Sequence, residues 1–315
     1  MRTCLPARSH DRRAAFPLSL AWLDCPPGAA VGDARGNFVA IGTMLPAIEL
    51  WDLDVLDATE PALVLGGPDA VAPAKSAGKK ERKARMKPGS HKDSVLGVAW
   101  NAEFRNVLAS ASADHTVKVW DIARGECAHT LAHHVDKVQA VAWNPAAASV
   151  LLTGGFDHRA ALADVRTPGG AVLSWALTAD VECASWIPGE AEQFLVSTED
   201  GHVTCLDARR GGGGSALFVL AAHDKPTSTL SLTAAAPGLL ATGSTDKAVK
   251  LWDIRKGRPE LLVTRDLRVG AVFATAFAGD AGRLLAAAGA KGTSTVWDVS
   301  CEAAVLSRWP ALSAR

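Results

Sequence analysis

Short runs of alternating apolar and polar residues, separated by polar turns, follow one another along most of the 315-residue chain. In Asn106–Trp120 two such runs flank a polar turn at Asp114, which is the pattern of a β-hairpin. The alternation predicts six four-stranded units. Their ranges are 18–66, 91–132, 134–177, 178–222, 223–264 and 268–308.

A Trp-Asp pair recurs at nearly regular intervals along these units. The pair occurs at Trp51-Asp52, Trp120-Asp121, Trp252-Asp253 and Trp297-Asp298, and it is replaced by Ala163-Asp164 and Leu206-Asp207 in between. From Asp121 onward, successive Asp positions are 43, 43, 46 and 45 residues apart. A period of about 40–45 residues with a Trp-Asp signature is typical of WD40 repeats, each of which forms one four-stranded blade. The sequence therefore predicts an all-β WD40 propeller with six recognisable blades.

The closure of the ring is not decided by the blade count. A propeller closes when one blade is shared between the chain ends or when complete blades meet edge to edge. Residues 1–17 are too short and too polar for a blade, so we expect either a six-bladed ring or one without a seventh, N-terminal blade. Open edges in the second case would favour aggregation.

The same pattern predicts the domain organisation. Residues 1–17 form a disordered or misassigned segment, residues 18–308 form the propeller with a basic insert at 67–90, and residues 309–315 form a tail.

Three polar residue types and a tryptophan recur at fixed spacing. A His lies 29 residues before the Trp position, a Ser or Thr lies four before the turn Asp, and that Asp lies six before the Trp position. Because imidazole, hydroxyl and indole groups can satisfy a buried carboxylate, we expect structural tetrads that fasten each blade. The members are His91, Ser110, Asp114 and Trp120; His134, Thr153 and Asp157; and His223, Thr242, Asp246 and Trp252.

A large apolar side chain also recurs in the strand after each His position. Its positions are Trp22, Trp100, Trp143, Trp186, Leu232 and Phe277. One large side chain at the same place in each blade would fill the space to the next blade, so we predict that these are core positions.

Ser, His and Asp are also the members of a hydrolase triad. A catalytic set occurs once, whereas this set recurs in three repeats, which favours the structural interpretation. Adjacent His133 and His134 would point to opposite faces of a strand, so no metal pair is expected there. We therefore predict no catalytic, cofactor-binding or metal-binding residues, no small-molecule substrate and no enzyme activity.

The charge of the chain is balanced, with 33 basic and 33 acidic residues, but its distribution is uneven. One run combines seven basic residues with a single acidic one. The basic residues are Lys75, Lys79, Lys80, Arg82, Lys83, Arg85 and Lys87. Such a run is typical of a nuclear address or of an arm that contacts RNA phosphates. A solvated loop without either role is the remaining interpretation.

The cysteine spacing argues against a disulfide-bonded or zinc-binding protein, and the hydropathy argues against a membrane or secreted protein. Six scattered cysteines without a Cys-x-x-Cys pair predict neither a disulfide framework nor a zinc site, and they fit a reducing compartment. No apolar run reaches the roughly 18 residues of a spanning helix, and the first residues lack the apolar centre of a signal peptide. We expect no membrane contact.

Several longer segments are more specific than a Trp-Asp pair. These are Gly42–Asp54, the Lys-rich insert, His91–Leu96, Arg105–Asp114, Asp136–Gln139, Ser197–Gly201 and Asp246–Asp253. With these segments in this order, the chain resembles the periodic tryptophan protein 1 family of nuclear WD-repeat proteins over nearly all of residues 18–300. Family members carry an acidic N-terminal region and additional strands ahead of the position of Pro17–Trp22, and neither is found in this sequence.

The resemblance implies a function. It implies a non-enzymatic scaffold in ribosome biogenesis that acts in large-subunit assembly and pre-rRNA processing in the nucleus and nucleolus. The implied partners are pre-ribosomal proteins and pre-rRNA. The alternative is a chromatin protein that binds histones and acts at rRNA genes.

Overall fold

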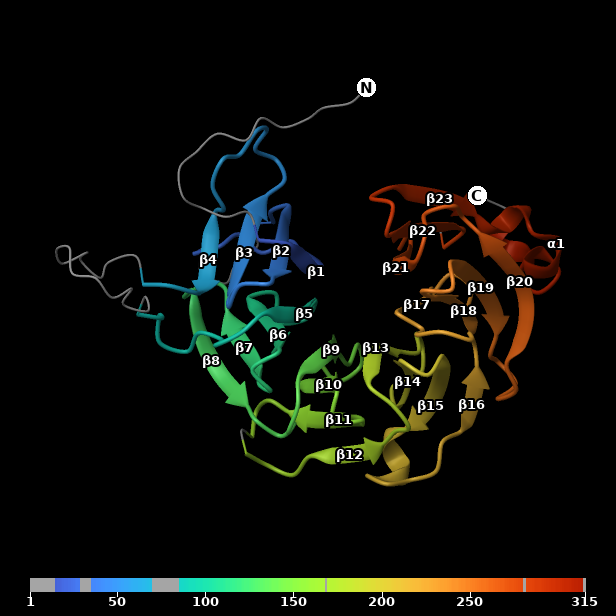
Figure 1. Ribbon diagram of the computed structural model, residues 1–315, viewed down its shortest axis with the longest axis horizontal. Coiled ribbons are helices and arrows are strands. Elements are labelled where there is room, and N and C mark those ends of the chain that lie inside the picture. The colour runs from blue at the N-terminus through green and yellow to red at the C-terminus, as the bar shows by residue number, and fades with distance from the viewer. Residues whose placement is uncertain (1–14, 29–34, 70–84, 168, 280–281, 314–315) are drawn as a thin grey trace.

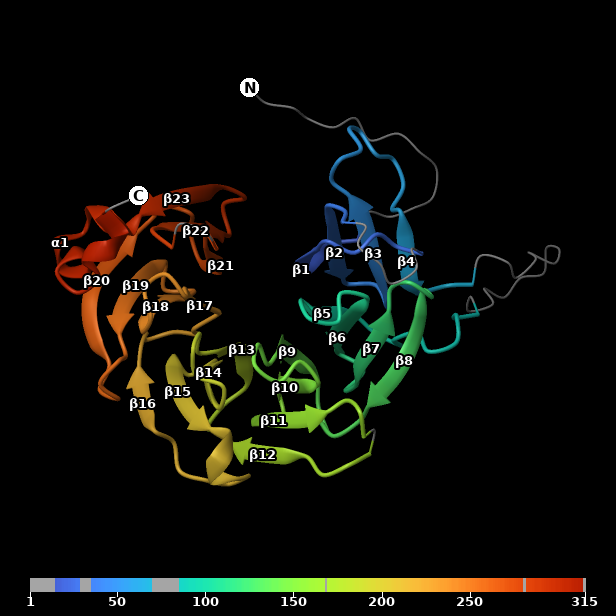
Figure 2. The same ribbon diagram turned by 180° about the vertical axis from the view of Figure 1, so that it is seen from behind.

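The computed structural model describes residues 15–28, 35–69, 85–167, 169–279 and 282–313. Within these residues, 23 strands form six antiparallel sheets, which stand as blades around a central axis (Figures 1 and 2). Strands follow one another in chain order within every sheet. The predicted propeller with six blades is confirmed.

The first three blades each have four strands. Blade 1 contains β1 (Pro17–Leu23), β2 (Phe38–Thr43), β3 (Ala47–Asp52) and β4 (Leu63–Gly66). Blade 2 contains β5 (Val95–Trp100), β6 (Val107–Ser112), β7 (Val117–Asp121) and β8 (Glu126–Leu131). Blade 3 contains β9 (Val138–Trp143), β10 (Val150–Gly155), β11 (Arg159–Asp164) and β12 (Leu173–Ala176).

The other three blades complete the described fold. Blade 4 contains β13 (Val181–Trp186), β14 (Gln193–Thr198), β15 (His202–Asp207) and β16 (Phe218–Ala221), with a short 3-10 helix η1 (Ala208–Arg210) after β15. Blade 5 contains β17 (Thr229–Leu232), β18 (Leu239–Gly243), β19 (Ala248–Asp253) and β20 (Glu260–Asp266). Blade 6 contains β21 (Val272–Phe277), β22 (Leu284–Gly289) and β23 (Ser294–Asp298).

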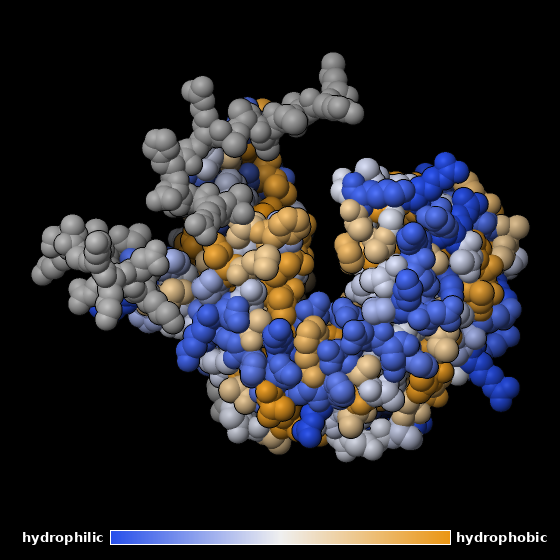
Figure 3. Space-filling view, in the orientation of Figure 1, coloured by the Kyte–Doolittle hydropathy of each residue, from blue (hydrophilic) through white to orange (hydrophobic). Residues whose placement is uncertain are grey.

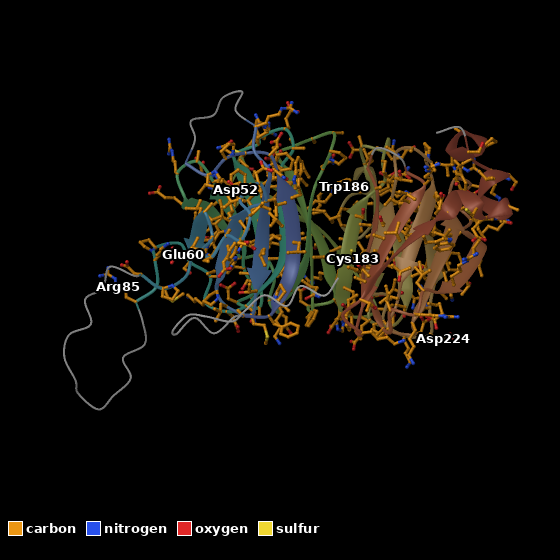
Figure 4. The ribbon with its side chains drawn as sticks, turned by 90° about the horizontal axis from the view of Figure 1, so that it is seen from above. Asp52, Glu60, Arg85, Cys183, Trp186 and Asp224 are labelled. Carbon is orange, nitrogen blue, oxygen red and sulfur yellow. The ribbon has the colours of Figure 1, made fainter. Side chains whose placement is uncertain are left out.

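Burial of the middle strands explains how the blades pack. In β6 and β10 every residue after the first is buried, on both faces of the sheet. A sheet covered on both faces needs apolar or small residues at consecutive positions, and these strands supply Ala, Leu, Gly, Ser and Thr. Figure 4 shows Asp52 and Trp186 toward one face of the ring and Asp224 toward the opposite face.

Blade 6 differs from the prediction of four strands. After β23 the chain forms η2 (Val299–Cys301), α1 (Ala303–Leu306) and η3 (Pro310–Ser313). Val305, Trp309 and Leu312 recur at helical spacing and are buried in one cluster with residues of blades 5 and 6. This segment therefore packs as short helices, and within the described residues no fourth strand pairs with β23.

The ring has an open side between blades 6 and 1 (Figure 1). Leu20 and Trp22 of blade 1 are 64% and 54% exposed, and Val296 of blade 6 is 64% exposed. The residue of blade 2 at the place of Val296 is Val119, which is only 3% exposed. Hydrophobic residues line the blade 1 wall of this hollow (Figure 3).

The open side corrects one prediction about the core. Trp22 was expected to pack between blades like Trp186, which is 6% exposed. Trp22 does make an edge-to-face contact with Trp100 of blade 2 at 5.7 Å, and it donates its indole N–H to Asn37, but it is not a core residue. More than half of its side chain is exposed, because no blade of the described structure precedes blade 1 and covers it.

Candidate functional site

The predicted tetrad residues of blade 2 meet in one hydrogen-bonded chain. His91 Nδ1 lies 3.0 Å from Asp114 Oδ2, and His91 Nε2 lies 2.7 Å from Ser110 Oγ. The Trp120 indole N–H donates to the same Ser110 oxygen over 2.8 Å. His91 precedes β5, Ser110 lies on β6, Asp114 lies in the β6–β7 turn and Trp120 lies on β7. The four residues therefore tie the segment before β5, strands β6 and β7 and the turn between them together.

The charges of this cluster follow from burial and hydrogen bonding. Burial lowers the pKa of His91, so the ring is neutral and donates from Nδ1 to Asp114. Burial opposes ionisation of Asp114, but hydrogen bonds from His91, Thr116 and the Lys92 backbone N–H outweigh it and hold the pKa of this carboxyl well below its usual range. Ser110 then donates to His91 Nε2 and accepts from Trp120, so each group has a partner.

Blade 5 repeats the arrangement. His223 Nδ1 lies 2.8 Å from Asp246 Oδ2, and His223 Nε2 lies 2.8 Å from Thr242 Oγ1. The Trp252 indole N–H donates to Thr242 Oγ1 over 3.0 Å. The contacts of blade 2 thus recur with Thr in place of Ser.

The Ser110–His91–Asp114 chain has the connectivity of a hydrolase triad. The burial of its side chains distinguishes this cluster from a catalytic triad. The side chains of His91 and Ser110 are fully buried, and the Ser110 oxygen also accepts the Trp120 indole N–H. A nucleophile in this position has no open side from which a substrate could approach.

Blade 3 lacks the Trp and fills its place with a second histidine. His134 makes the usual contacts, with Nδ1 2.9 Å from Asp157 Oδ2 and Nε2 2.8 Å from Thr153 Oγ1. Ala163 stands at the Trp position, and His133 Nε2 lies 2.9 Å from Thr153 Oγ1, where the indole N–H would donate. His133 thus supplies the hydrogen-bond donor that Ala163 cannot.

The expectation that His133 and His134 point to opposite faces was wrong. The rings lie 4.6 Å apart, and both contact Thr153. The expectation assumed a strand, but these residues lie in the loop between β8 and β9, where side-chain alternation does not apply.

The burial of His133 predicts an acid-sensitive fold. Burial, and next the neighbouring His134, lower the pKa of His133 from 6.5 to about 4. Below pH 6.5 the unfolded chain gains this proton while the folded chain does not, so stability falls as the pH drops from 6.5 toward 4. We expect this group to contribute about 1–3 kcal/mol of that loss. Urea unfolding at pH 7.0 and 4.5 measures it.

The His133→Asn variant isolates this contribution, because Asn can donate to Thr153 but does not titrate. Its stability should fall less than that of the unmodified chain over the same pH range. The control is His115→Asn, at an exposed turn position with positive φ that Asn adopts readily, and it should keep the full pH dependence. An unchanged pH dependence in His133→Asn would show that other groups cause the acid sensitivity.

Blade 4 keeps only the aspartate of the tetrad. Leu177, Val196 and Leu206 stand at the His, Ser/Thr and Trp positions. Asp200 accepts hydrogen bonds from Thr178 and Thr198 instead. Burial opposes its ionisation, but these hydrogen bonds and one with His202 lower the pKa of Asp200 to about 2.

The basic insert is described only at its two ends. Lys75, Lys79, Lys80, Arg82 and Lys83 lie outside the described residues. A bridge between Pro68 and Met86 and the hydrogen bond from Asp69 N to Arg85 O join the two ends. Arg85 is exposed at this base (Figure 4), whereas Lys87 Nζ donates to the Val64 carbonyl over 3.1 Å. The Lys87 side chain therefore forms a hydrogen bond within blade 1.

The described parts of the chain offer no metal site and no membrane span. They contain no group of three or more His, Cys, Asp or Glu side chains that could hold a metal ion. Cys25, Cys127, Cys183, Cys205 and Cys301 are free thiols. None of the helices described is long and apolar enough to cross a membrane.

Comparison with known proteins agrees with this geometry. The family described as WD domain, G-beta repeat, matches residues 84–121, 125–163 and 214–253. An uncharacterised WD repeat-containing protein of Schizosaccharomyces pombe is 43% identical over 288 residues, which cover 90% of the chain and 54% of that protein. Periodic tryptophan protein 1 of Saccharomyces cerevisiae is 44% identical over 124 residues, 38% of the chain and 21% of that protein.

The homolog of Periodic tryptophan protein 1 in Drosophila melanogaster is 39% identical over 112 residues, or 36% of the chain and 21% of that protein. The chain thus spans about half the length of the fission yeast relative and about a fifth of the other two. The six blades and the recurring His, Ser or Thr, Asp and Trp clusters define a WD40 β-propeller. Within that class, the chain is similar to Periodic tryptophan protein 1 and its Drosophila homolog over somewhat more than a third of its length.

Proposed function

We propose that the protein is a non-enzymatic scaffold in ribosome biogenesis, which acts in large-subunit assembly and pre-rRNA processing in the nucleus and nucleolus. The ribosomal part of the proposal rests on the family. The scaffold part rests on one structural observation: the repeated His, Ser or Thr and Asp groups are buried and bonded to one another. In this proposal they hold blades together, and the surfaces of the blades bind pre-ribosomal proteins.

The insert between blades 1 and 2 is the proposed RNA contact. Its basic residues Lys79, Lys80, Arg82 and Lys83 lie between two ends that are fixed to the ring at Gly67 and Lys87. Lysine and arginine bind RNA phosphates without reading sequence, and that binding weakens with salt. The Lys87 side chain, bonded to the Val64 carbonyl, is left out of this proposal.

Neutralising Lys79, Lys80, Arg82 and Lys83 to Gln tests the RNA arm. We expect the affinity for a labelled single-stranded RNA of pre-rRNA sequence to fall at least about tenfold near 0.1 M salt, because up to four phosphate contacts are lost. The dependence of log Kd on log salt should become shallower by up to about 3. Fluorescence anisotropy at several salt concentrations measures both.

The matched control neutralises four exposed basic residues elsewhere on the ring. These are Lys92, Lys137, Lys256 and Arg258. This variant loses the same formal charge and should keep most of the RNA affinity. Equal losses in the two variants would mean that total charge, and not the insert, binds RNA.

One observation favours the chromatin alternative. The central cavity of about 600 Å³ is lined by Glu182 of β13. Burial, and then Glu199 and Asp180, raise the pKa of Glu182, so three carboxyl groups lie close together at this blade. A basic histone tail would find negative charge there.

Titration of the purified chain with a histone tail peptide separates the two functions. Saturable binding that is lost in Glu182→Gln would support the chromatin function. An unchanged affinity in that variant, or no saturation, would leave the scaffold function as the better supported one.

A further inference from the structure

The missing tetrad of blade 4 leaves a pocket at the rim. A cavity of about 410 Å³ lies between the outer strand β12 of blade 3 and strands β15 and β16 of blade 4, which are neighbours in Figure 1. Leu206 and Leu177, which replace the Trp and His of a complete tetrad, both line it. Trp120 and Trp252 occupy this place in blades 2 and 5, and His133 replaces the Trp in blade 3. In blade 4 neither a Trp nor a replacing His occupies the Trp position of the tetrad.

A buried donor in the wall of this pocket has no partner among the described residues. The Trp175 side chain is 2% exposed and packs edge to face on Phe194 at 5.2 Å. Its indole N–H meets no acceptor in the described structure, whereas Trp120 and Trp252 donate to a Ser or Thr oxygen. Val196 stands at the hydroxyl position of the blade 4 tetrad, so this position offers no hydroxyl acceptor. A buried unsatisfied N–H costs about 1–3 kcal/mol, so an oxygen acceptor in the pocket would be favoured.

A side-chain carboxylate also lines this pocket. Asp200 lines it and stays ionised, because hydrogen bonds from Thr178 and Thr198 stabilise its charge. His202 also lines it, with Nδ1 3.2 Å from Asp200 Oδ1. The remaining lining includes the apolar Leu177, Leu206 and Val219. Like Trp175 Nε1, His202 Nδ1 has no partner with hydrogen-bond geometry among the described residues. The pocket lining thus includes two ring nitrogens without a hydrogen bond, one carboxylate and apolar side chains.

We propose that this pocket between blades 3 and 4 binds an extended peptide segment of a partner protein. A backbone carbonyl of the peptide accepts the Trp175 indole N–H, and a backbone N–H or a lysine or arginine head group donates to Asp200. An apolar side chain contacts Leu177 and Leu206. A peptide supplies a carbonyl, an N–H and a side chain at short spacing, and the cavity volume lies within the range of about 300–1,000 Å³ usual for ligand sites. This site does not depend on the proposed role in ribosome biogenesis.

The test uses the purified 315-residue chain and a randomised heptapeptide display library as the probe. Peptides are selected on the unmodified chain and counter-selected on Leu206→Trp, which places in blade 4 the side chain that fills blades 2 and 5. Synthetic copies of the selected peptides are then measured by fluorescence anisotropy. We expect Leu206→Trp to weaken binding at least about tenfold by filling the pocket.

Two further variants make the result specific. Trp175→Phe keeps an aromatic ring and removes the N–H, and should weaken binding about three- to tenfold for the loss of one hydrogen bond. Trp143→Phe is its control: that indole donates to the Ala99 carbonyl elsewhere in the ring, and binding should change less than about twofold. If Leu206→Trp does not fold by circular dichroism, Val219→Arg at the 59% exposed lip replaces it.

The indole N–H signal of Trp175 provides a second readout. In a ¹⁵N-tryptophan-labelled chain, the signal that disappears in Trp175→Phe should shift when the peptide is added. Three results would overturn the proposal. They are no peptide that survives counter-selection, equal binding by all variants, and a Trp175 signal that exchanges with water but does not respond to peptide, which would indicate a hydrated pocket only.

Discussion

The Trp120→Ala variant is expected to lose about 3–5 kcal/mol of unfolding free energy. Trp120 is 1% exposed and packs in the cluster that joins blades 1 and 2. The substitution leaves a cavity there, and it removes the N–H that donates to Ser110. Loss of packing therefore combines with an altered hydrogen-bond network. Urea unfolding followed by far-UV circular dichroism measures the difference.

Trp22→Ala is the matched control within the same chain. Trp22 is 54% exposed on the open side of the ring, and its indole N–H bonds to the Asn37 side chain. Its removal should cost about 1 kcal/mol or less, because most of its surface already contacts solvent. Similar losses in both variants would mean that the face of blade 1 is covered in solution and that the ring is not open as described.

Trp309→Ala is expected to have a comparable effect, about 3–5 kcal/mol, although the residue lies outside the predicted blades. Trp309 is 6% exposed and donates its indole N–H to the Pro237 carbonyl over 3.1 Å. The Arg255 guanidinium lies 4.4 Å from the ring centre. The variant should therefore release the segment after β23 from blades 5 and 6. Urea unfolding, with hydrogen exchange to locate the loss, measures this effect.

The neighbouring Arg308→Ala variant serves as the control for Trp309. Arg308 pairs with Asp253 at 3.1 Å and with the exposed Glu260. Pairs of this kind near the surface contribute about 1 kcal/mol or less. If Trp309→Ala were as mild as Arg308→Ala, the helical segment would be an accessory to blade 6 and not part of its core.

The repeat makes most of the fold predictable. Each Trp-Asp position marks the third strand of a blade, so the spacing from Asp121 to Asp298 is enough to locate five blades along the chain. The tetrads are predictable for the same reason, because a turn Asp and a His that recur at one spacing must lie at the same place in each blade. Their burial and hydrogen-bond distances depend on packing between blades and are not contained in the spacing.

Three features depend on geometry that the pattern does not contain. The role of His133 depends on the conformation of a loop, where strand alternation says nothing about side-chain direction. The short helices after β23 have a helical spacing in Val305, Trp309 and Leu312, which conflicts with the fourth strand that the repeat predicts. The exposure of Trp22 depends on the angle between successive blades, which no local pattern encodes.

The rim pocket has a partial signal in the sequence. Leu206 in place of Trp and Leu177 in place of His mark blade 4 as an inner repeat without a tetrad. Whether another side chain fills that space cannot be read from spacing, since blade 3 fills it with His133 and blade 4 does not. The indole N–H of Trp175, which has no partner among the described residues, is a property of the packed blades.

Affinity purification of the tagged chain from cells, with and without nuclease, tests the scaffold function most directly. Bound RNA is sequenced and bound proteins are identified. We expect large-subunit pre-rRNA and early assembly proteins, with part of the protein set retained after nuclease treatment because the ring contacts proteins directly. Recovery of histones without pre-rRNA would contradict the scaffold function and leave the family as a guide to the fold alone.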